Sequence, residues 1–571
     1  MFSITFNPGF ALVLAAFAVL AAPRSARAPI MALGAAAALF LMLDRDFGST
    51  PAIAQMGLSV VLLNLDALNQ VFGIAFIAAV VLLSIYSSAR RNRYEDAAIL
   101  VLAGGAVSAL FVGDLVSFVA AAAIAGLAAV WVVLASPIPG ANGAGVRLLI
   151  WHGLEGLLFL AGVAFHLSAG QSKTHFAFDV ASLDGGFIFA ALMIRVGAPF
   201  AHVWLKDAVS HASGAGGAAL SAFTTLFGVY ALARMFPAEP LLVPIGAGMM
   251  AVGAFFAIAA DDARRAVAYA QTAQTGVCVA LIGLGSPLAA AGASAHAFTL
   301  LFVFVLLQMA LGAVVMQRGT ARLSTLQGLA QTMPMSTGFL LLGGLAAAAL
   351  PGMSLYVSQT VALAASAHWE DRFLWTGISA LSGVMMAAVT LRVSLAAFLP
   401  AAKSGARTEA PFAMQLAAAL AAFFCIAIGF NPTWLYNLLP SNNPLSASGL
   451  TFAPFTLDRI APQLELLGAA GAGYILLRAL RLAPAERAVR LLDVDALYRG
   501  PVATAGRWGG AILLRLYGAG QGLLDQAAAR LGRAFAVWSH SWDRPYRGRW
   551  AAAGQFAAIA ALLALILIAR R

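Results

Sequence analysis

Long apolar runs separated by short polar connections form the dominant pattern along this chain of 571 residues. A helix needs about 20 mostly apolar residues to cross a bilayer, and roughly 14 to 16 segments meet that requirement. The runs are continuous rather than alternating, which favours helices over the strands of a membrane barrel. The sequence therefore predicts an all-α polytopic membrane protein. The expected spans are residues 5–22, 29–43, 67–89, 96–112, 115–135, 147–168, 186–203, 216–236, 240–259, 266–286, 291–316, 336–362, 373–399, 411–431, 463–478 and 550–569.

Charged residues gather in the connections, and their sign alternates from one connection to the next. The basic connections contain Arg24, Arg27, Arg90, Arg91, Arg93, Lys206, Arg264, Arg265, Arg318, Arg322, Lys403 and Arg407. The acidic connections contain Asp44, Asp46, Asp179, Asp184, Glu370 and Asp371. Because basic loops stay on the inner side of a membrane, we expect a multi-pass protein of a bacterial-type inner membrane with both termini outside.

The composition agrees with a membrane protein and argues against nucleic-acid binding, metal sites and disulfides. Hydrophobic residues make up 62% of the chain and charged residues only 10%. The net charge of +11 follows from topology, so it does not indicate nucleic-acid binding. Cys278 and Cys425 both lie in apolar runs, without the spacing of a metal site or a disulfide framework. We therefore expect a lipid-embedded protein with no metal, no cofactor and no catalytic residues of its own.

Two regions depart from plain membrane spans. Residues 47–66 are apolar but interrupted, which favours a hairpin or a re-entrant segment on the outer side. Residues 479–549 hold many arginines interleaved with aromatic residues, and apolar residues at helical spacing occur in 510–524. This pattern predicts an amphipathic arm on the inner face of the membrane. The alternative is a disordered basic loop.

Several local motifs occur in a recognisable order. The chain reads FVGDLVSF at 111–118, IRVGAPFAHVWLKDA at 194–208, DDARRAVAYAQTAQTG at 261–276, LPGMSLYVSQ at 350–359 and LLDVDALYRGP at 491–501. In this order they resemble the antiporter-like membrane subunits shared by respiratory complex I, Mrp-type cation/proton antiporters and membrane-bound hydrogenases. The resemblance covers roughly residues 60–400. It implies two inverted five-helix repeats, each with a broken helix.

The resemblance also implies a line of ionisable residues at mid-membrane, and this chain lacks most of them. Members of the family have a Glu on the fifth helix, a Lys on the seventh, and further Lys, His or Glu residues on the eighth, eleventh and twelfth. Counting from the matched motifs gives Ala123, Arg195, Leu220, Leu226, Leu300 and Gln359 at those places. Arg195 is the one cation that remains, and an arginine cannot relay a proton because it stays charged in a protein.

Arg195 needs a counter-charge if it lies inside the membrane. Glu155 is an acid well inside a predicted span, and at 1.5 Å per residue the two lie at similar depth. His152 is three residues from Glu155, on the same helical face. We therefore expect an ion pair between Glu155 and Arg195 with His152 nearby. In that pair Arg195 is either a structural partner or a residual electrostatic element of a working channel. The alternative for Glu155 is a polar contact with the backbone or a serine of a neighbouring helix.

The other polar residues have two interpretations. His202, Asp207, His296, Gln271 and Gln359 are candidates for a thin hydrated track. Equally, these side chains are typical of hydrogen bonds between membrane helices. The glycine-rich stretch at 213–217 interrupts an apolar run, which favours a helix break. Asp114 stands where a helix N-cap is expected.

These observations predict a domain order and three candidate functions. The expected parts are N-terminal helices 1–95, an antiporter-like core 96–400, C-terminal helices 401–478, the arm 479–549 and a final span 550–571. The first function is a scaffold or coupling subunit that lies in the lipid bilayer beside other membrane subunits of an antiporter or complex I-like assembly. The second is a subunit that moves protons or monovalent cations through Glu155, histidines and water. The third is an independent solute carrier. The sequence shows no nucleotide, flavin or iron–sulfur motif that would indicate an enzyme.

Overall fold

The structure of the protein is a computed structural model. The described residues are 6–542, apart from gaps at 56–57, 90–91, 173, 175, 368–371, 395–407, 441–451, 481–492, 495, 497–499 and 502. Contacts divide the chain into two units, Met1–Leu491 and Leu492–Arg571. Each unit is described by itself.

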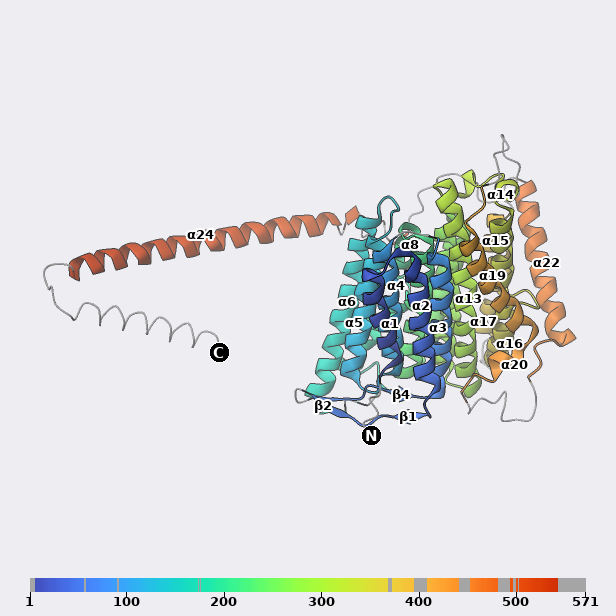
Figure 1. Ribbon diagram of the computed structural model, residues 1–571, viewed down its shortest axis with the longest axis horizontal. Coiled ribbons are helices and arrows are strands. Elements are labelled where there is room, and N and C mark those ends of the chain that lie inside the picture. Colours follow the sequence, from blue (N-terminus) through green and yellow to red (C-terminus); the bar gives the residue numbers. More distant parts are fainter. Residues whose placement is uncertain are drawn as a thin grey trace. The chain divides into compact units, whose positions relative to one another are not determined.

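The first unit is a bundle of helices that stand side by side (Figure 1). Within the described residues, 12 helices are long and apolar enough to cross a membrane, and Pro8–Ala21 and Pro334–Ala347 are shorter apolar helices. The predicted class, an all-α polytopic membrane protein, is confirmed. The helices of this unit are α1 Pro8–Ala21, α2 Arg24–Leu43, α3 Ala67–Ser87, α4 Arg93–Phe111, α5 Leu115–Leu134, α6 Ala141–Ser168, α7 Leu183–Val196, α8 Val203–His211, α9 Gly214–Phe223, α10 Thr225–Met235, α11 Leu242–Ala259, α12 Ala263–Leu284, α13 Pro287–Arg318, η1 Leu323–Thr325, α14 Leu329–Thr332, α15 Pro334–Ala347, α16 Ser354–Ser366, α17 Phe373–Met385, η2 Met386–Leu391, α19 Phe412–Phe430, α20 Pro432–Tyr436 and α22 Leu457–Ala479.

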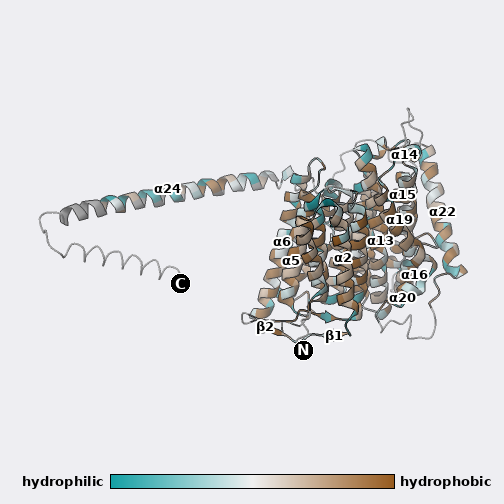
Figure 2. Ribbon diagram, in the orientation of Figure 1, coloured by the Kyte–Doolittle hydropathy of each residue, from teal (hydrophilic) through white to brown (hydrophobic). Residues whose placement is uncertain are grey.

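The two ends of the bundle differ in charge and in structure. One end carries Arg93 at the start of α4, Arg147 in the first turns of α6 and Arg264 at the start of α12. We call this end the basic face. Figure 2 shows apolar residues along the helices of the bundle and hydrophilic residues gathered near their ends, as expected for helices that contact lipid.

The opposite end carries short strands, and we call it the strand face. β1 (Gly48–Ser49) pairs with β4 (Asn64–Leu65), and β2 (Ile53–Gln55) pairs with β3 (Leu58–Val60), both antiparallel. The hairpin interpretation of residues 47–66 is therefore confirmed. Asp114 caps α5 by accepting from Ser117 N at 2.8 Å, as predicted, and it also accepts from Val61 N at 2.8 Å. This carboxylate thus fastens the hairpin region to the bundle.

Within the described part of the chain, α7–α8 and α15–α16 are broken membrane helices that run in opposite directions. α7 leads from the strand face to a break at residues 197–202, and α8 continues to the basic face. α15 leads from the basic face to a break at residues 348–353, and α16 continues to the strand face. Each break contains one glycine and one other residue with positive φ, namely Gly197 and Phe200 in the first, Ala349 and Gly352 in the second. This arrangement fits the two inverted five-helix repeats that the resemblance implies.

Side chains satisfy backbone carbonyls that the breaks release. Trp204 Nε1 donates to Ile194 O at 2.8 Å in the first break. In the second, Gln274 Nε2 donates to Ala347 O at 3.1 Å, and Gln463 Nε2 donates to Ala349 O at 3.0 Å. Backbone groups released by a break inside a membrane need partners within the protein, and these bonds supply them.

The predicted break at the glycine-rich stretch 213–217 is wrong. Residues 214–217 form the first turn of α9, and Ser213 caps it by accepting from Gly216 N. The glycines serve close packing instead, since a Cβ on Gly214 would lie 2.4 Å from the Tyr86 hydroxyl and 2.8 Å from Gly312 Cα. The apolar run is interrupted because two helices meet there and not because one helix unwinds.

The second unit contains a single long described helix, α24, at Ala503–Trp542. Residues 510–524, predicted to be an amphipathic helix, lie within it. Large apolar side chains are exposed along it, among them Trp508, Leu514, Tyr517 and Leu531. The predicted last span, residues 550–569, lies outside the described residues.

Candidate functional site

The α6 helix builds the site because its polar residues share one buried face. Leu148, His152, Glu155, Phe159 and Gly162 follow each other at intervals of three or four residues, and all are buried. That spacing keeps them on the same side of an α-helix. The other side of α6 carries exposed apolar residues such as Ile150 and Leu157, which suits contact with lipid.

The central feature is an ion pair between Glu155 and Arg195. Arg195 Nε lies 2.6 Å from Glu155 Oε1, and the two side chains are 2% and 7% exposed. The contact predicted from their matched depth is therefore present. Arg195 Nη2 also donates to Ala122 O at 3.2 Å, and the guanidinium lies over the Phe227 ring at 5.4 Å. Each of these contacts offsets part of the cost of a buried cation.

His152 completes a three-residue group with this ion pair. Its Nδ1 lies 2.7 Å from Glu155 Oε2, and because an ionised carboxylate only accepts, this nitrogen is the donor. Its ring centre is 5.1 Å from that of Trp204 in α8. His152 Nε2 and Arg195 Nη1 are buried and have no hydrogen-bond partner among the described residues. The group therefore presents two polar atoms that can bind a water molecule.

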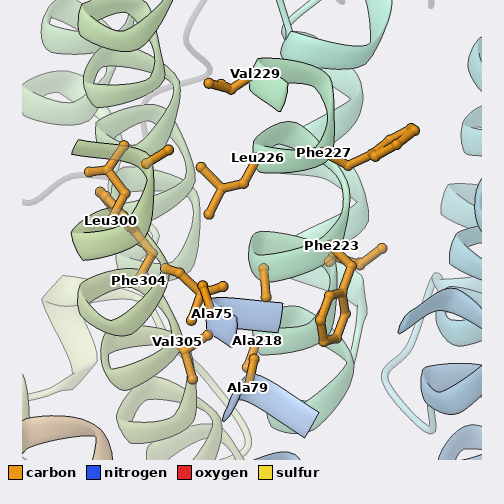
Figure 3. Close-up of a cluster of buried hydrophobic side chains, with 14 of the residues drawn as sticks. Ala75, Ala79, Ala218, Phe223, Leu226, Phe227, Val229, Leu300, Phe304 and Val305 are labelled. Atoms are coloured by element: carbon orange, nitrogen blue, oxygen red, sulfur yellow. The ribbon is translucent and has the colours of Figure 1, made fainter. Parts of the chain in front are cut away.

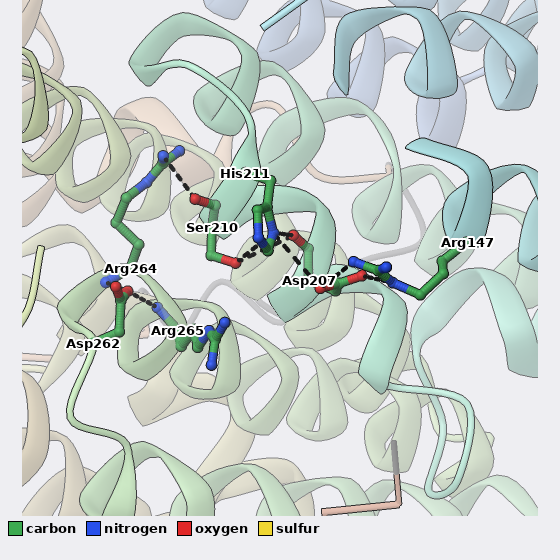
Figure 4. A network of polar contacts seen from close by, with 7 residues as sticks. All are labelled: Arg147, Asp207, Ser210, His211, Asp262, Arg264 and Arg265. Carbon is green, nitrogen blue, oxygen red and sulfur yellow. Dashed lines mark hydrogen bonds and ion pairs between the residues drawn. The ribbon is translucent and has the colours of Figure 1, made fainter. Parts of the chain in front are cut away.

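A second polar group lies at the basic face, where α6 meets α8 (Figure 4). Arg147 holds Asp207 with two bonds, Nε to Oδ2 at 2.6 Å and Nη2 to Oδ1 at 3.1 Å. His211 Nδ1 lies 2.8 Å from Asp207 O and 3.6 Å from Asp207 Oδ1. Arg264 lies nearby and donates to the carbonyl oxygens of Ala212 at 2.5 Å and Ser213 at 3.1 Å. Asp207, a candidate from the sequence, is thus the centre of a charged group on α8.

A third polar group lies where α6 meets α7 near the strand face. His166 Nδ1 is 2.7 Å from Asp184 Oδ2, and its Nε2 is 3.2 Å from Ser172 O. Sequence reasoning missed this pair and also missed Arg147 as the partner of Asp207. His166 is eleven residues after Glu155, which is close to three turns of a helix, so the shared face of α6 was the signal that could have found it.

The remaining candidates lie outside the group formed by His152, Glu155 and Arg195 and make contacts with other helices. Gln271 Nε2 donates to Ser221 O at 2.8 Å, and Gln359 Nε2 donates to Ser382 Oγ at 2.6 Å. His296 contacts Gln274 Oε1 and Ser358 Oγ, both at 3.1 Å. His202 stacks on Phe256 with ring centres 6.1 Å apart. These contacts join helices to one another, as expected for polar residues between membrane helices.

The places where the family resemblance implies relay residues are apolar and tightly packed. Leu220, Leu226 and Leu300 are at most 1% exposed. Figure 3 shows Leu226 and Leu300 in one cluster of hydrophobic side chains with Phe304 and Val305. Ala123 lies on the exposed side of α5, and its neighbour Ala122 is the residue whose carbonyl meets Arg195. The counted position therefore does not face the ion pair.

Comparison with known proteins agrees with the resemblance seen in the motifs. Residues 176–386 match the family described as NADH:quinone oxidoreductase/Mrp antiporter, transmembrane. NADH-quinone oxidoreductase subunit N of Desulforudis audaxviator is 29% identical over 238 residues, which are 39% of this chain and 47% of that protein. Hydrogenase-4 component B of Escherichia coli is 24% identical over 471 residues, 71% of this chain and 69% of that protein. The chain thus spans less than half of the length of the first of these relatives.

Solved structures extend the likeness to most of the fold. A chain of the Mrp complex from Dietzia sp. superposes with a TM-score of 0.67 and 16% identity, over 84% of this chain and 98% of that one. A chain of an archaeal membrane-bound sulfane sulfur reductase gives a TM-score of 0.65 and 18% identity, over 81% of this chain and 98% of that one. At this level of identity the likeness concerns the fold.

Proposed function

This chain belongs, through residues 176–386, to the NADH:quinone oxidoreductase/Mrp antiporter transmembrane family, and we propose that it is one membrane subunit of a multi-subunit cation/proton-translocating assembly. Two relatives support this proposal, since one is named as a subunit of an NADH-quinone oxidoreductase and the other as a component of hydrogenase-4. The related solved chains belong to an Mrp complex and a respiratory membrane complex. Any redox chemistry would then reside in other subunits.

Within such an assembly, we propose that this subunit acts as scaffold and coupling element without a lateral proton relay. The observation that carries this proposal is the apolar centre of the bundle at Leu226, Leu300 and Phe304 (Figure 3). A relay needs groups that gain and lose protons, or water between them, and tightly packed leucine and phenylalanine offer neither. The bonds of Gln271, His296 and Gln359 to neutral neighbours support the same conclusion.

The membrane setting follows from the same reasoning. The first unit has twelve helices able to span a bilayer within its described part. The basic face carries Arg93, Arg147 and Arg264, and basic residues stay on the side from which insertion begins. We propose that the basic face is the inner side of a bacterial-type cell membrane, which leaves both termini outside.

The test replaces side chains along the absent relay and measures ion-driven activity of the whole assembly in sealed vesicles. Leu226→Ala and Gln359→Ala should each leave that activity within about twofold of the parent. A tenfold loss, about 1.4 kcal/mol in a barrier, would mean that ions or protons cross these positions. Leu242→Ala, another buried leucine replacement but at the start of α11, is the control for a general packing defect.

A further inference from the structure

A hollow of about 620 Å³ opens at the basic face, lined by residues from the start of α2, the start of α4, the connection between α5 and α6, and the end of α13. We propose that this hollow binds the phosphate headgroup of an anionic membrane lipid, with Arg27 and Arg93 as the cationic contacts. The site goes beyond the proposed scaffold and coupling function. Failure to bind a lipid there would therefore leave that function standing.

The two arginines of the hollow lie close together because both reach the turn between α1 and α2. Arg93 Nη1 donates to Leu20 O at 3.4 Å, and Arg27 Nε donates to Ala22 O at 3.4 Å. These two carbonyl oxygens belong to residues only two positions apart. The helices α1, α2 and α4 also lie beside one another in the bundle (Figure 1). Backbone carbonyls therefore hold two guanidinium groups where a single phosphate can meet both.

The contacts described for Arg93 are with neutral groups. Besides its bond to Leu20 O, its Nη2 donates to the Tyr94 hydroxyl at 3.1 Å, and its guanidinium carbon lies 5.0 Å from the centre of the Tyr94 ring. An arginine carries five N–H donors and a full positive charge, so bonds to a carbonyl and a hydroxyl leave that charge in place. Hydrogen bonds from arginine to phosphate are charge-assisted and often bidentate. Arg93 is thus able to bind a phosphate group.

Glu95 also lines the hollow, but its carboxylate is engaged by the interior of the bundle. The Ser213 hydroxyl donates to Glu95 Oε1, and Glu95 is fully buried, whereas Arg93 is exposed. The N–H groups at the start of α4 are also in use, because Asn92 Oδ1 accepts from Tyr94 N at 3.2 Å and from Glu95 N at 3.3 Å. The groups left to bind an anion are therefore the arginine side chains and not the end of the helix.

Exposed apolar side chains continue from the hollow towards the middle of the membrane. On α1, Leu14 and Phe17 are 65% and 66% exposed, and on α2, Leu33 is 68% exposed. Phe17 precedes Leu20, whose carbonyl Arg93 contacts, by about one helical turn. A lipid with its phosphate at the arginines can lay its acyl chains along these side chains. A free phosphate ion gains nothing from this surface, which therefore favours a lipid as the ligand.

The size and the place of the hollow suit a lipid headgroup. Its volume of about 620 Å³ falls within the range of sites for small ligands, roughly 300–1,000 Å³. Tyr94 at its rim is exposed, and tyrosine is enriched at the level of the headgroups. Basic pockets between membrane helices on the cytoplasmic side bind anionic lipid headgroups, and this is the side proposed above for the basic face.

The test measures lipid binding to the purified full-length protein in uncharged detergent micelles by native mass spectrometry. Dimyristoylphosphatidylglycerol is the anionic probe. Dimyristoylphosphatidylcholine, which has the same chains and a phosphate but no net charge, is the comparison. The anionic lipid should bind saturably and at least about tenfold more tightly than the neutral one. Inorganic phosphate at the same concentration should not displace it, because phosphate cannot use the apolar surface.

Variants locate the binding at the hollow. Arg27→Gln with Arg93→Gln should weaken binding of the anionic lipid at least about tenfold, because both cationic contacts are lost. Arg265→Gln with Arg322→Gln is the matched control and should leave the affinity unchanged, since these exposed arginines lie near the start of α12, outside the hollow, and carry the same total charge.

A variant that keeps every charge guards against a folding defect. Met316 lines the hollow and is 44% exposed, so Met316→Trp should narrow the hollow and weaken lipid binding without changing the arginines. Equal affinity for the two lipids, displacement of the anionic lipid by inorganic phosphate, or an equal loss of affinity in the Arg265 and Arg322 control would overturn the proposal. So would unchanged affinity in both the Arg27 and Arg93 variant and Met316→Trp.

Discussion

The buried pair of Glu155 and Arg195 makes a sharp prediction about stability. Glu155→Gln leaves Arg195 with only the Ala122 carbonyl and the Phe227 ring, and it also removes the acceptor of His152. Arg195→Gln leaves the Glu155 carboxylate with one hydrogen bond from His152. Each single change thus leaves a buried charge without its counter-charge, which costs about 3–5 kcal/mol when the pair is broken on one side.

Replacing both residues should cost less than the sum of the two single changes. With Glu155→Gln and Arg195→Gln together, no charge is left unpaired, and two amide side chains of suitable length can bond to each other. Groups in direct contact typically show coupling energies of about 0.5–3 kcal/mol, and a pair this buried belongs at the upper end. The double variant should therefore be milder than the sum by about 2–3 kcal/mol.

The assay is equilibrium unfolding by denaturant in mixed micelles, with loss of helical circular dichroism as the signal. Asp46→Asn is the matched control, because this carboxylate lies on an exposed connection at the strand face and its removal should change the free energy of unfolding by less than about 0.5 kcal/mol. Single variants as stable as the Asp46→Asn control, or strictly additive effects, would refute the reasoning that the pair is buried and mutually dependent.

Two other predictions concern assembly and packing. Deleting residues 520–549 should release this chain from its complex in native gel electrophoresis, because the long helix α24 exposes apolar side chains that suit a neighbouring subunit; an unchanged complex size would contradict this. Gly214→Ala should lower the free energy of unfolding by about 1–3 kcal/mol, because its Cβ would press on Tyr86 and on the Gly312 backbone. Gly153→Ala is the control, with no atom within 4 Å of an added Cβ, and it should be neutral or slightly stabilising; equal effects of the two changes would contradict the packing argument.

The position of a residue along its membrane helix could be predicted from the sequence. The side of the helix on which its side chain lies could not. The start of α5 at Leu115 and its cap Asp114 follow from residue types alone, as does the common depth of Glu155 and Arg195. Ala123, the position on α5 given by the motif count, lies on the exposed side of that helix. Which side of a helix faces the bundle depends on all the helices packed around it. Counting from a motif therefore gives the position of a residue along the helix but not the face on which it lies.

Contacts between segments far apart in the chain could not be predicted from the sequence either. Arg147 and Asp207 stand 60 residues apart, and each reads as a residue at a membrane edge until α6 and α8 are packed together. The helix breaks show the same limit, since the break at residues 197–202 depends on Trp204 bonding back to Ile194 O. The glycines at 214–217 are compatible with an unwound helix and with close helix packing. Only the contacts of α9 with its neighbours show that they serve packing.

The central claim is that this subunit has no lateral water or charge path through its middle. A cryo-electron microscopy map of the native assembly, at a resolution that shows ordered water, tests the claim most directly. The account predicts no ordered water in the layer formed by Leu226, Leu300 and Phe304. A continuous file of water crossing the Leu226–Leu300 layer towards Gln359 would contradict it.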